Sequence, residues 1–323
     1  MRYRKLGRTE IEVSEIGYGA WGIGGKMWLG GNDGDAIAAL RRALDLGLNF
    51  IDTAFVYGEG HSEELIGQHV PREIHVATKI PPKNMLWPAR PGIGIKEVFP
   101  YDHVMRCTEE SLRRLKRDSV DLQQFHVWNP EWIDSDEWRR AFEDLEKSGK
   151  AKNTGVSLNN HQPDSALDLV RTGLCDTVQV IYNIFDQSPE VKLFPLCLEL
   201  GIGVLARVPL DEGALTGRIN QQTVFEPGDF RERYFRENRR ADVVNHVSAL
   251  QDDLKGFETE GTLPQIALRF CLSDAAVSTV IPGMRSIPNV EANCAVSDKG
   301  TLPLEVLAIL KQHAWEKDYY AGW

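Results

Sequence analysis

Short apolar runs of strand length alternate along the chain with amphipathic stretches of helical periodicity. The stretch Asp35–Leu46 is typical, because Ile37, Leu40, Ala43 and Leu44 recur at the spacing of one helical face. The pattern predicts strands over Ser14–Ala20, Asn49–Ala54, His75–Lys79, Val120–His126, Asn153–Leu158, Thr177–Asn183, Gly203–Val208 and Ala276–Pro282. It predicts helices over Asp35–Leu46, Ser62–His69, Asp102–Lys116 with Asp102 as N-cap, Asp136–Lys147, Asp164–Arg171, Glu190–Leu200, Asn289–Val296 and Leu304–Trp315.

This alternation indicates parallel strands joined by crossover helices. About eight such units close into a (β/α)8 TIM barrel, an α/β fold, which we predict as a single domain over residues 1–323. An open doubly wound sheet is the alternative, and periodicity alone does not separate the two. A long connection, residues 211–261, lies between the seventh and eighth expected strands, and connections of this length are usually lids or mobile segments. The Arg-rich part of it, residues 225–240, is expected to be a solvated helix because its acidic residues nearly cancel the charge.

Composition and charge narrow the range of partners. Apolar residues make up 42% of the chain and charged residues 26%, which is ordinary for a globular protein. The 37 basic and 47 acidic residues give a net charge of −10, which disfavours nucleic acid as a partner. The five cysteines are scattered without a C-x-x-C pair, so neither a disulfide framework nor a metal site is expected. A charged N-terminal segment and the lack of a long apolar run predict a soluble, cytoplasmic protein with no membrane partner.

One glycine motif imitates a nucleotide-binding signature. Residues Gly17–Gly22 match the pattern G-x-G-x-x-G, whose glycines open a pyrophosphate-binding helix in dinucleotide-binding folds. Here the residues that follow, up to Gly31, are too rich in glycine for a helix, and Asp52 comes too late to be the usual acidic partner. We interpret the motif as a loop at a strand end whose backbone is available to a ligand.

Four titratable residues, Asp52, Tyr57, Lys79 and His126, sit at or just after the carboxyl ends of successive expected strands. In a parallel barrel these ends face one rim, where catalytic groups are found. A lysine beside a tyrosine lowers the pKa of the phenol, and a nearby carboxylate keeps the lysine charged. Tyr57 can then donate a proton to a carbonyl oxygen that His126 orients. A nicotinamide would supply the hydride, since no side chain can.

The same residues allow other interpretations. Tyr57 also fits a surface tyrosine before a turn, Lys79 a strand-end charge, and His126 a hydrogen-bonded core histidine. A phosphate-sugar isomerase or an aldolase on a barrel would use Lys79 and Asp52 as well. A regulatory or binding protein on the same barrel is the remaining alternative.

The motifs resemble those of the aldo-keto reductase family over essentially the whole chain. Residues Phe50–Gly58 match the family's Asp…Tyr motif, while Lys79 and His126 match the other two members of its catalytic tetrad. The resemblance implies a (β/α)8 barrel that reduces an aldehyde or ketone with NADPH, with NADH as the alternative cofactor, and that oxidises the alcohol in reverse. It makes Tyr57 the proton donor, and it makes Lys79 and Asp52 the residues that adjust the pKa of Tyr57. A non-catalytic or redox-sensing regulatory subunit is the alternative within the same resemblance.

Further segments resemble the cofactor-binding parts of that family. Ser157 and Gln179 match the residues that contact the nicotinamide amide. The resemblance implies that the remaining cofactor-binding residues are Asp52, Asn159, Arg207, Pro209, Leu210, Gly213, Leu215, Gly217, Arg218, Gly283, Arg285, Asn289 and Asn293.

Within this set the resemblance gives Pro209, Leu210, Gly213, Leu215, Gly217 and Arg218 to the pyrophosphate, and Gly283, Arg285, Asn289 and Asn293 to the adenosine end of the cofactor. At that end Arg285 would meet the 2′-phosphate, and Asn289 and Asn293 would face adenine. Two positions depart from the family pattern. Asn159 stands one place later than the usual asparagine, because Leu158 follows the serine, and Arg207 stands where many members stack an aromatic ring on the nicotinamide.

Three tryptophans lie on loops that should border the nicotinamide, and wide indole walls suit a small or aromatic carbonyl compound. Plain core packing is the alternative for each of them. The aromatic tail, Asp318–Trp323, is expected to fold over the same mouth. The predicted substrate-binding residues are Trp21, Tyr57, Trp87, His126 and Trp128.

Overall fold

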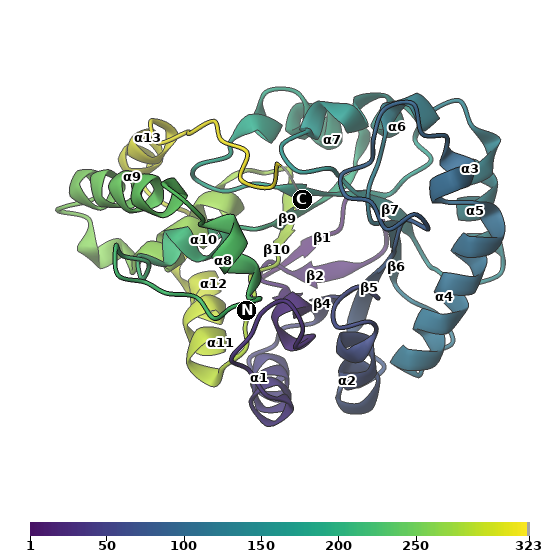
Figure 1. The fold of residues 1–323 in the computed structure, drawn as a ribbon, viewed down its shortest axis with the longest axis horizontal. Helices are drawn as coiled ribbons and strands as arrows, with labels where there is room; N and C mark the ends of the chain where they lie inside the picture. Colours follow the sequence, from purple (N-terminus) through teal and green to yellow (C-terminus); the bar gives the residue numbers. More distant parts are fainter. Residues whose placement is uncertain (322–323) are drawn as a thin grey trace.

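Eight parallel strands form one continuous sheet that curls into a barrel (Figure 1) in the computed structural model, which describes residues 1–321. Neighbouring strands along the chain are neighbours in the sheet throughout, as a right-handed succession of β-α units requires. The strands are β3 (Tyr18–Gly19), β4 (Phe50–Asp52), β5 (His75–Ile80), β6 (Leu122–Phe125), β7 (Thr154–Ser157), β8 (Thr177–Ile181), β9 (Gly203–Arg207) and β10 (Val277–Val280). Each of them lies within or overlaps a predicted strand.

The first and last strands of the sheet are joined, so the barrel is closed. The amide of Gly17 donates to the carbonyl of Val280 at 2.8 Å, and the amide of Gly19 donates to the carbonyl of Pro282 at 3.0 Å. Val280 in turn donates to the carbonyl of Glu15 at 2.9 Å. These parallel bridges confirm the predicted (β/α)8 barrel and exclude the open doubly wound sheet.

An N-terminal hairpin covers one end of the barrel. Its antiparallel strands are β1 (Tyr3–Lys5) and β2 (Glu12–Ser14), and Figure 1 shows them across the centre of the ring. Between them, the amide of Arg8 donates to the carbonyl of Gly201, just before β9 begins. The hairpin shares a buried cluster with the barrel interior, formed by Leu6, Ile11, Val13, Phe50, Ala77, Leu122, Leu205 and Ile281. Because this cluster fills the amino end, the carboxyl ends of the strands form the open rim.

Helices surround the sheet. They are α1 (Asp33–Asp45), α2 (His61–His69), α3 (Ile95–Val98), α4 (Tyr101–Leu115), α5 (Asp136–Lys147), α6 (Leu167–Thr172), α7 (Leu193–Leu200), α8 (Phe230–Tyr234), α9 (Arg239–Asp253), α10 (Leu263–Ser273), α11 (Ile287–Cys294), α12 (Val296–Lys299) and α13 (Leu304–Lys311). Short 3-10 turns are η1 (Ala20–Ile23), η2 (Pro130–Trp132), η3 (Pro163–Ala166), η4 (Ser188–Glu190), η5 (Asp211–Thr216) and η6 (Glu258–Glu260).

Several predicted boundaries were wrong. The expected strand Ser14–Ala20 breaks into the end of β2, the short β3 and the start of η1. Pro100, whose extended backbone precedes the helix, is the N-cap of α4, so Asp102 lies inside the first turn instead. The long connection holds two helices, α8 and α9, and the helix α10 that completes the seventh unit was not predicted.

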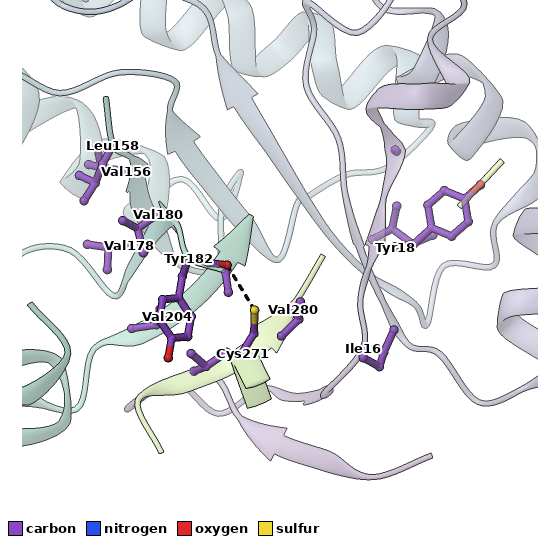
Figure 2. Packing of buried hydrophobic residues seen from close by; sticks show 14 of the residues in the cluster. Ile16, Tyr18, Val156, Leu158, Val178, Val180, Tyr182, Val204, Cys271 and Val280 are labelled. Carbon is purple, nitrogen blue, oxygen red and sulfur yellow. Dashed lines mark hydrogen bonds between the residues drawn. The ribbon is translucent and has the colours of Figure 1, made fainter. Parts of the chain in front are cut away.

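The main apolar core lies between the sheet and the helices. Figure 2 shows Val178 and Val180 of β8, Val204 of β9 and Cys271 of α10, which belong to one buried apolar cluster. The Cys271 thiol also donates to the carbonyl of Tyr182 at 3.3 Å. The continuous burial of both faces of these strands explains their nearly uninterrupted apolar sequence.

The wall of the barrel has no room for a side chain at Gly155 of β7. A Cβ there would lie 2.1 Å from Oγ1 of Thr177 and 2.8 Å from its carbonyl oxygen on the neighbouring strand. We expect Gly155→Ala to lower the free energy of unfolding by about 1–3 kcal/mol, the usual cost of overpacking, in urea denaturation. Gly94→Ser is the matched control, because its nearest neighbour would lie at 3.9 Å and serine suits an N-cap. An unchanged denaturation midpoint for Gly155→Ala would contradict this packing.

Candidate active site

A buried ion pair lies at the open rim of the barrel. Nζ of Lys79, on β5, lies 2.6 Å from Oδ2 of Asp52 at the end of β4, and the two side chains are 0% and 2% exposed. Nζ also donates to the carbonyl of Thr53 at 2.9 Å. Burial lowers the pKa of Lys79, but the charges of Asp52 and Tyr57 and the hydrogen bonds to both together raise it by more, so the net pKa lies above its ordinary value. Lys79 is therefore an ammonium ion throughout the neutral range.

Tyr57 completes this arrangement from the turn after β4. Its hydroxyl accepts a hydrogen bond from Nζ of Lys79 at 3.2 Å, and Nζ lies 4.9 Å from the centre of its ring. The turn depends on Gly58, which has φ of +72° and whose Cβ would lie 2.0 Å from the carbonyl oxygen of Gly24. Glycine is the residue that tolerates both the left-handed backbone and this close approach.

The net pKa of Tyr57 differs in direction from the sequence-based expectation. Burial raises the pKa of the phenol, and the Lys79 ammonium offsets only part of that rise, so the net value lies above the ordinary 10.0. The predicted effect of the lysine is present, but the desolvation of the phenolate outweighs it. The hydroxyl is consequently protonated at neutral pH, the state that a proton donor needs.

His126 stands beside Tyr57, directly after β6. Its ring lies edge-to-face with the Tyr57 ring at 6.1 Å and with the Trp87 ring at 5.8 Å. Nδ1 is buried and has no hydrogen-bond partner within residues 1–321. Burial lowers the pKa of His126 well below its ordinary value, and the positive charges of Lys79 and Arg207 lower it further. The ring is thus neutral and can offer one N–H to an oxygen atom.

Two glutamines hold the second oxygen of Asp52. Nε2 of Gln179, on β8, donates to Oδ1 at 2.7 Å, and Nε2 of Gln124, on β6, approaches the same atom at 3.4 Å. The resemblance gives Gln179 to the nicotinamide amide, a role that this contact does not test, and the sequence analysis missed Gln124. Strand alternation could have found it, because Gln124 lies two residues before His126 and so on the same face of β6.

Ser157, Asn159 and Arg207 also reach the rim, but their side chains have different surroundings. Ser157 is buried at the end of β7. The Asn159 side chain is engaged with a loop, because its Oδ1 accepts from the amide of Ala89 at 3.1 Å. Nη2 of Arg207 donates to the carbonyl of Leu158 at 3.0 Å, whereas its buried Nε has no partner in the described part of the chain. Its charge lowers the pKa of both Tyr57 and His126, which places it near the reacting groups.

The segment after β9 forms a loop, residues 208–217, with unusual backbone geometry. Val208, Asp211 and Glu212 have φ of +55°, +47° and +54°, values that non-glycine residues rarely adopt. Gly213, at φ of +103°, faces open space, since nothing lies within 4 Å of where its Cβ would be. The loop contains most of the residues that the resemblance gave to the pyrophosphate, namely Pro209, Leu210, Gly213, Leu215 and Gly217, with Arg218 exposed just beyond it. Leu215 is fully buried, so its side chain packs in the core.

A second cationic group lies after β10. Arg285 donates through Nη1 to the carbonyls of Leu29 at 2.7 Å and Trp28 at 3.2 Å. Burial lowers the pKa of Arg285, and the charge of Arg231 lowers it further. The guanidinium of Arg231 lies 4.5 Å from the centre of the Trp28 ring, and that of Arg285 lies 5.9 Å from it. Arg231 is already paired with Asp229 at 2.8 Å, whereas the hydrogen bonds of Arg285 within residues 1–321 go to carbonyl oxygens. The charge of Arg285 therefore remains available to an anion such as a phosphate group.

The other residues that the resemblance assigns to the adenosine end lie after β10 and on α11. Gly283 is exposed after β10, and Asn289 and Asn293 lie on α11 one turn apart, on the same face. Asn289 is half-buried and Asn293 is buried.

Two of the three tryptophans border the catalytic groups. Trp21 stacks near Tyr57 with ring centres 6.2 Å apart, and Trp87 meets His126 edge-on. Trp128 was predicted to line the pocket, but it has no exposed surface and packs against Trp132 and Trp138, so it is a core residue. Strand and loop patterns do not tell which way a loop tryptophan turns.

The aromatic tail folds back onto the rim as far as the structure describes it. The Tyr320 hydroxyl donates to a carboxylate oxygen of Glu212, and the Tyr320 ring lies 5.7 Å from the ring of His161. Burial raises the pKa of Glu212 to about 7. The last part of the predicted segment Asp318–Trp323, residues 322–323, lies outside the described residues.

The described residues contain neither a metal-binding cluster nor a membrane-spanning helix. Within residues 1–321, no group of three or more His, Cys, Asp or Glu side chains is arranged to hold a metal ion. Within residues 1–321, every helix is too short or too polar to span a lipid bilayer.

The sequence profile described as the Aldo/keto reductase family matches residues 15–314. The chain belongs to this family. It is 30% identical to the aldo-keto reductase YhdN of Bacillus subtilis (strain 168), with 90% of this chain and 87% of the relative covered. It is 29% identical to the NADH-specific methylglyoxal reductase of Escherichia coli (strain K12), covering 91% and 93%. It is also 28% identical to a probable voltage-gated potassium channel subunit beta of Arabidopsis thaliana, covering 92% of each.

Solved structures agree with this membership of the aldo/keto reductase family. The holo form of an aldo-keto reductase from Bacillus halodurans has a TM-score of 0.76 and 26% identity, with 97% of this chain and 96% of that chain covered. An aldo/keto reductase from Klebsiella pneumoniae, solved with NADP and acetate, has a TM-score of 0.68 and 26% identity, covering 97% and 95%.

The neutral state of His126 has a consequence for stability. A histidine in the unfolded chain has a pKa of about 6.5, whereas the pKa of His126 in the folded protein is well below that. Below about pH 6.5 the unfolded state therefore binds a proton that the folded state does not. Stability should therefore fall with decreasing pH, by up to about 1.4 kcal/mol per pH unit from this ring.

The measurement is the free energy of unfolding in urea between pH 7.5 and pH 5.5, and His126→Gln should show the shallower decline. His69→Gln, on α2, controls for the loss of a histidine elsewhere. Identical pH profiles for the wild type and His126→Gln would contradict a neutral, buried imidazole.

Proposed function

We propose that this aldo/keto reductase family member reduces an aldehyde or ketone to the alcohol with NADPH, and oxidises the alcohol in reverse, with Tyr57 as proton donor. The observation that carries the proposal is the continuous contact from Asp52 through Lys79 to the hydroxyl of Tyr57, at 2.6 and 3.2 Å, on the open rim of the barrel. A charged lysine against a protonated phenol is the arrangement that general acid catalysis uses.

Each side chain then has a defined task. The bound nicotinamide supplies hydride to the carbonyl carbon. Tyr57 gives its proton to the carbonyl oxygen, on which negative charge develops, and Lys79 stabilises the phenolate that remains. Neutral His126 offers an N–H to the same oxygen and orients it, while Asp52 keeps Lys79 charged and in place.

The residues present fit a dinucleotide. Arg285 lies beside Trp28 with its hydrogen bonds on carbonyl oxygens, so its charge is available to a phosphate group, and the loop 208–217 presents the open side of Gly213. We assign Ser157 and Gln179 to the nicotinamide amide, the loop 208–217 to the diphosphate and Arg285 to the 2′-phosphate. NADPH is favoured because the Klebsiella pneumoniae relative was solved with NADP, and NADH is the alternative because another relative is NADH-specific.

The substrate proposed is a small carbonyl compound held between Trp21 and Trp87. Both rings lie beside the catalytic pair, and each combines an apolar face with a single donor. No metal ion is assigned to the reaction. The five free cysteines are in keeping with a reducing, cytoplasmic location.

A regulatory role is the second candidate, because one relative is a probable potassium channel subunit beta. The complete Asp52–Lys79–Tyr57 chain supports catalysis without excluding regulation. Oxidation of NADPH with a panel of simple aldehydes separates the two, since a purely regulatory subunit would turn over none of them.

Tyr57→Phe should abolish carbonyl reduction, by at least about 100-fold in kcat, because the general acid is lost. NADPH affinity should stay within about 2-fold, because the hydroxyl contacts Lys79 and lies apart from the phosphate-binding segments. The measurement is steady-state turnover together with NADPH binding by fluorescence titration. Tyr3→Phe, an exposed tyrosine at the opposite end of the barrel, is the control. Unchanged turnover in Tyr57→Phe would remove Tyr57 from the mechanism.

Arg285→Ala should weaken the binding of NADPH, with a rise in its Kd of about 10-fold or more, and should affect the binding of NADH far less. The reason is that only NADPH carries the 2′-phosphate. Titration of both nicotinamides measures the two affinities directly. Arg41→Ala removes an exposed positive charge on α1 and serves as the charge-matched control. Equal losses for both cofactors would mean that the 2′-phosphate is recognised elsewhere.

A further inference from the structure

The loop 208–217 is held in a conformation that its own sequence does not favour. Three non-glycine residues within five positions, Val208, Asp211 and Glu212, have positive φ, and for a β-branched residue such as Val208 this is a clear outlier. Backbone of this kind persists only where surrounding contacts over-determine it. Contacts with other segments must therefore hold the loop in this conformation.

One constraint is a buried ion pair with the C-terminal tail. Nζ of Lys317 lies 2.6 Å from Oδ1 of Asp211, and the two side chains are only 5% and 3% exposed. The hydroxyl of Tyr234, on α8, lies 3.2 Å from the same Oδ1 and 3.2 Å from Nζ, so the three groups form a triangle. A buried pair of this kind is stable only in one geometry, because separating it leaves a charge uncompensated.

The Lys317 ammonium is also enclosed by aromatic rings. Its Nζ lies 5.0 Å from the ring centre of Tyr319, 5.2 Å from that of Trp315, 5.6 Å from that of Tyr234 and 5.9 Å from that of Phe185. Such rings attract a desolvated cation through their negative faces. The cage therefore fixes the position from which Lys317 contacts the loop.

The rest of the tail is anchored on both sides of this contact. Before it, the amide of Trp315 donates to the carbonyl of Phe185 at 2.8 Å. After it, Nη1 of Arg239, on α9, donates to the carbonyl of Tyr319 at 2.7 Å. Tyr320 then bonds Glu212, the residue next to Asp211. The tail thus contacts two consecutive strained residues of the loop.

We propose that Lys317 is a positioning residue for the dinucleotide loop, and that docking of the tail residues 316–320 and binding of the dinucleotide reinforce each other. The inference rests on the proposed function, in which the loop 208–217 contacts the cofactor's diphosphate. Lys317 acts through Asp211: it holds the strained loop in the conformation that the ligand uses. By linkage, a dinucleotide that binds only this conformation stabilises the docked tail by the same factor.

The first test is NADPH affinity, measured by fluorescence titration of the full chain. Lys317→Met and Asp211→Asn should each weaken the affinity for NADPH by about 10-fold. The double variant should lose no more affinity than either single variant, because all three variants break the same contact. For Lys317→Met, whose altered residue lies outside the loop and outside the tetrad, kcat at saturating NADPH should stay within about 2-fold while the affinity falls. Lys317→Arg should restore most of the affinity by conserving the charge.

Lys311→Met is the matched control, because it removes a lysine of α13 whose ion pair with Glu190 is 41% exposed on the lysine side. It should leave NADPH affinity unchanged. Equal affinity in the wild type and Lys317→Met would overturn the inference while leaving the proposed function standing. Failure of the wild type to bind NADPH at all would overturn both.

The second test uses the wild type alone and so does not depend on how a variant folds. Trypsin cleaves after Lys317 only when that side chain leaves its cage, and the rate of cleavage at the Lys317–Asp318 bond can be followed by intact mass. Saturating NADPH should slow that cleavage by about 10-fold, the reciprocal of the effect on affinity. Cleavage at the same rate with and without bound NADPH would show that tail and loop are independent.

Discussion

The rim of this barrel depends on one buried ion pair, between Lys79 and Asp52. Removing two charges from water costs several kcal/mol per ion, so the pair is stable only with a short contact and with its remaining hydrogen-bonding capacity satisfied. Here Gln124 and Gln179 approach the second carboxylate oxygen. The four side chains come from β4, β5, β6 and β8, so the pair is satisfied only when the sheet has curled in this register. Closure of the barrel and assembly of the site are therefore the same event.

The charge that the ion pair fixes determines the protonation of its neighbours. Burial alone would favour neutral groups at this rim, and it raises the pKa of Tyr57 and lowers that of His126. Lys79 works against burial at Tyr57 and with it at His126. The result is a protonated phenol beside a neutral imidazole, with an ammonium behind the phenol. This combination suits proton transfer to a carbonyl oxygen, because the Lys79 ammonium already lies beside the phenolate that forms.

The order of strands and the catalytic residues were accessible from sequence because both follow from local periodicity. A residue at the carboxyl end of a parallel strand faces the rim whatever the details of packing, so Asp52, Lys79 and His126 could be placed together before any coordinates were known. Tyr57 follows by its short distance from Asp52. Strand alternation places Gln124 on the same face as His126, but a glutamine on an apolar strand has no chemistry of its own. Its role therefore follows only from its contact with Asp52.

What could not be predicted depends on contacts between distant segments. The N-terminal hairpin has strands too short for a periodic pattern, and its position follows from filling the barrel end. Trp87 and Trp128 occupy similar loops, yet one borders His126 and the other is buried, because neighbouring aromatic rings decide the direction. The strained loop after β9 shows the same limit most clearly. Nothing local favours positive φ at Val208 or Asp211, and a partner of Asp211 is Lys317, 106 positions away. Local sequence specifies the scaffold, while the shape of the ligand-facing loops is set by the tertiary structure that the scaffold makes possible.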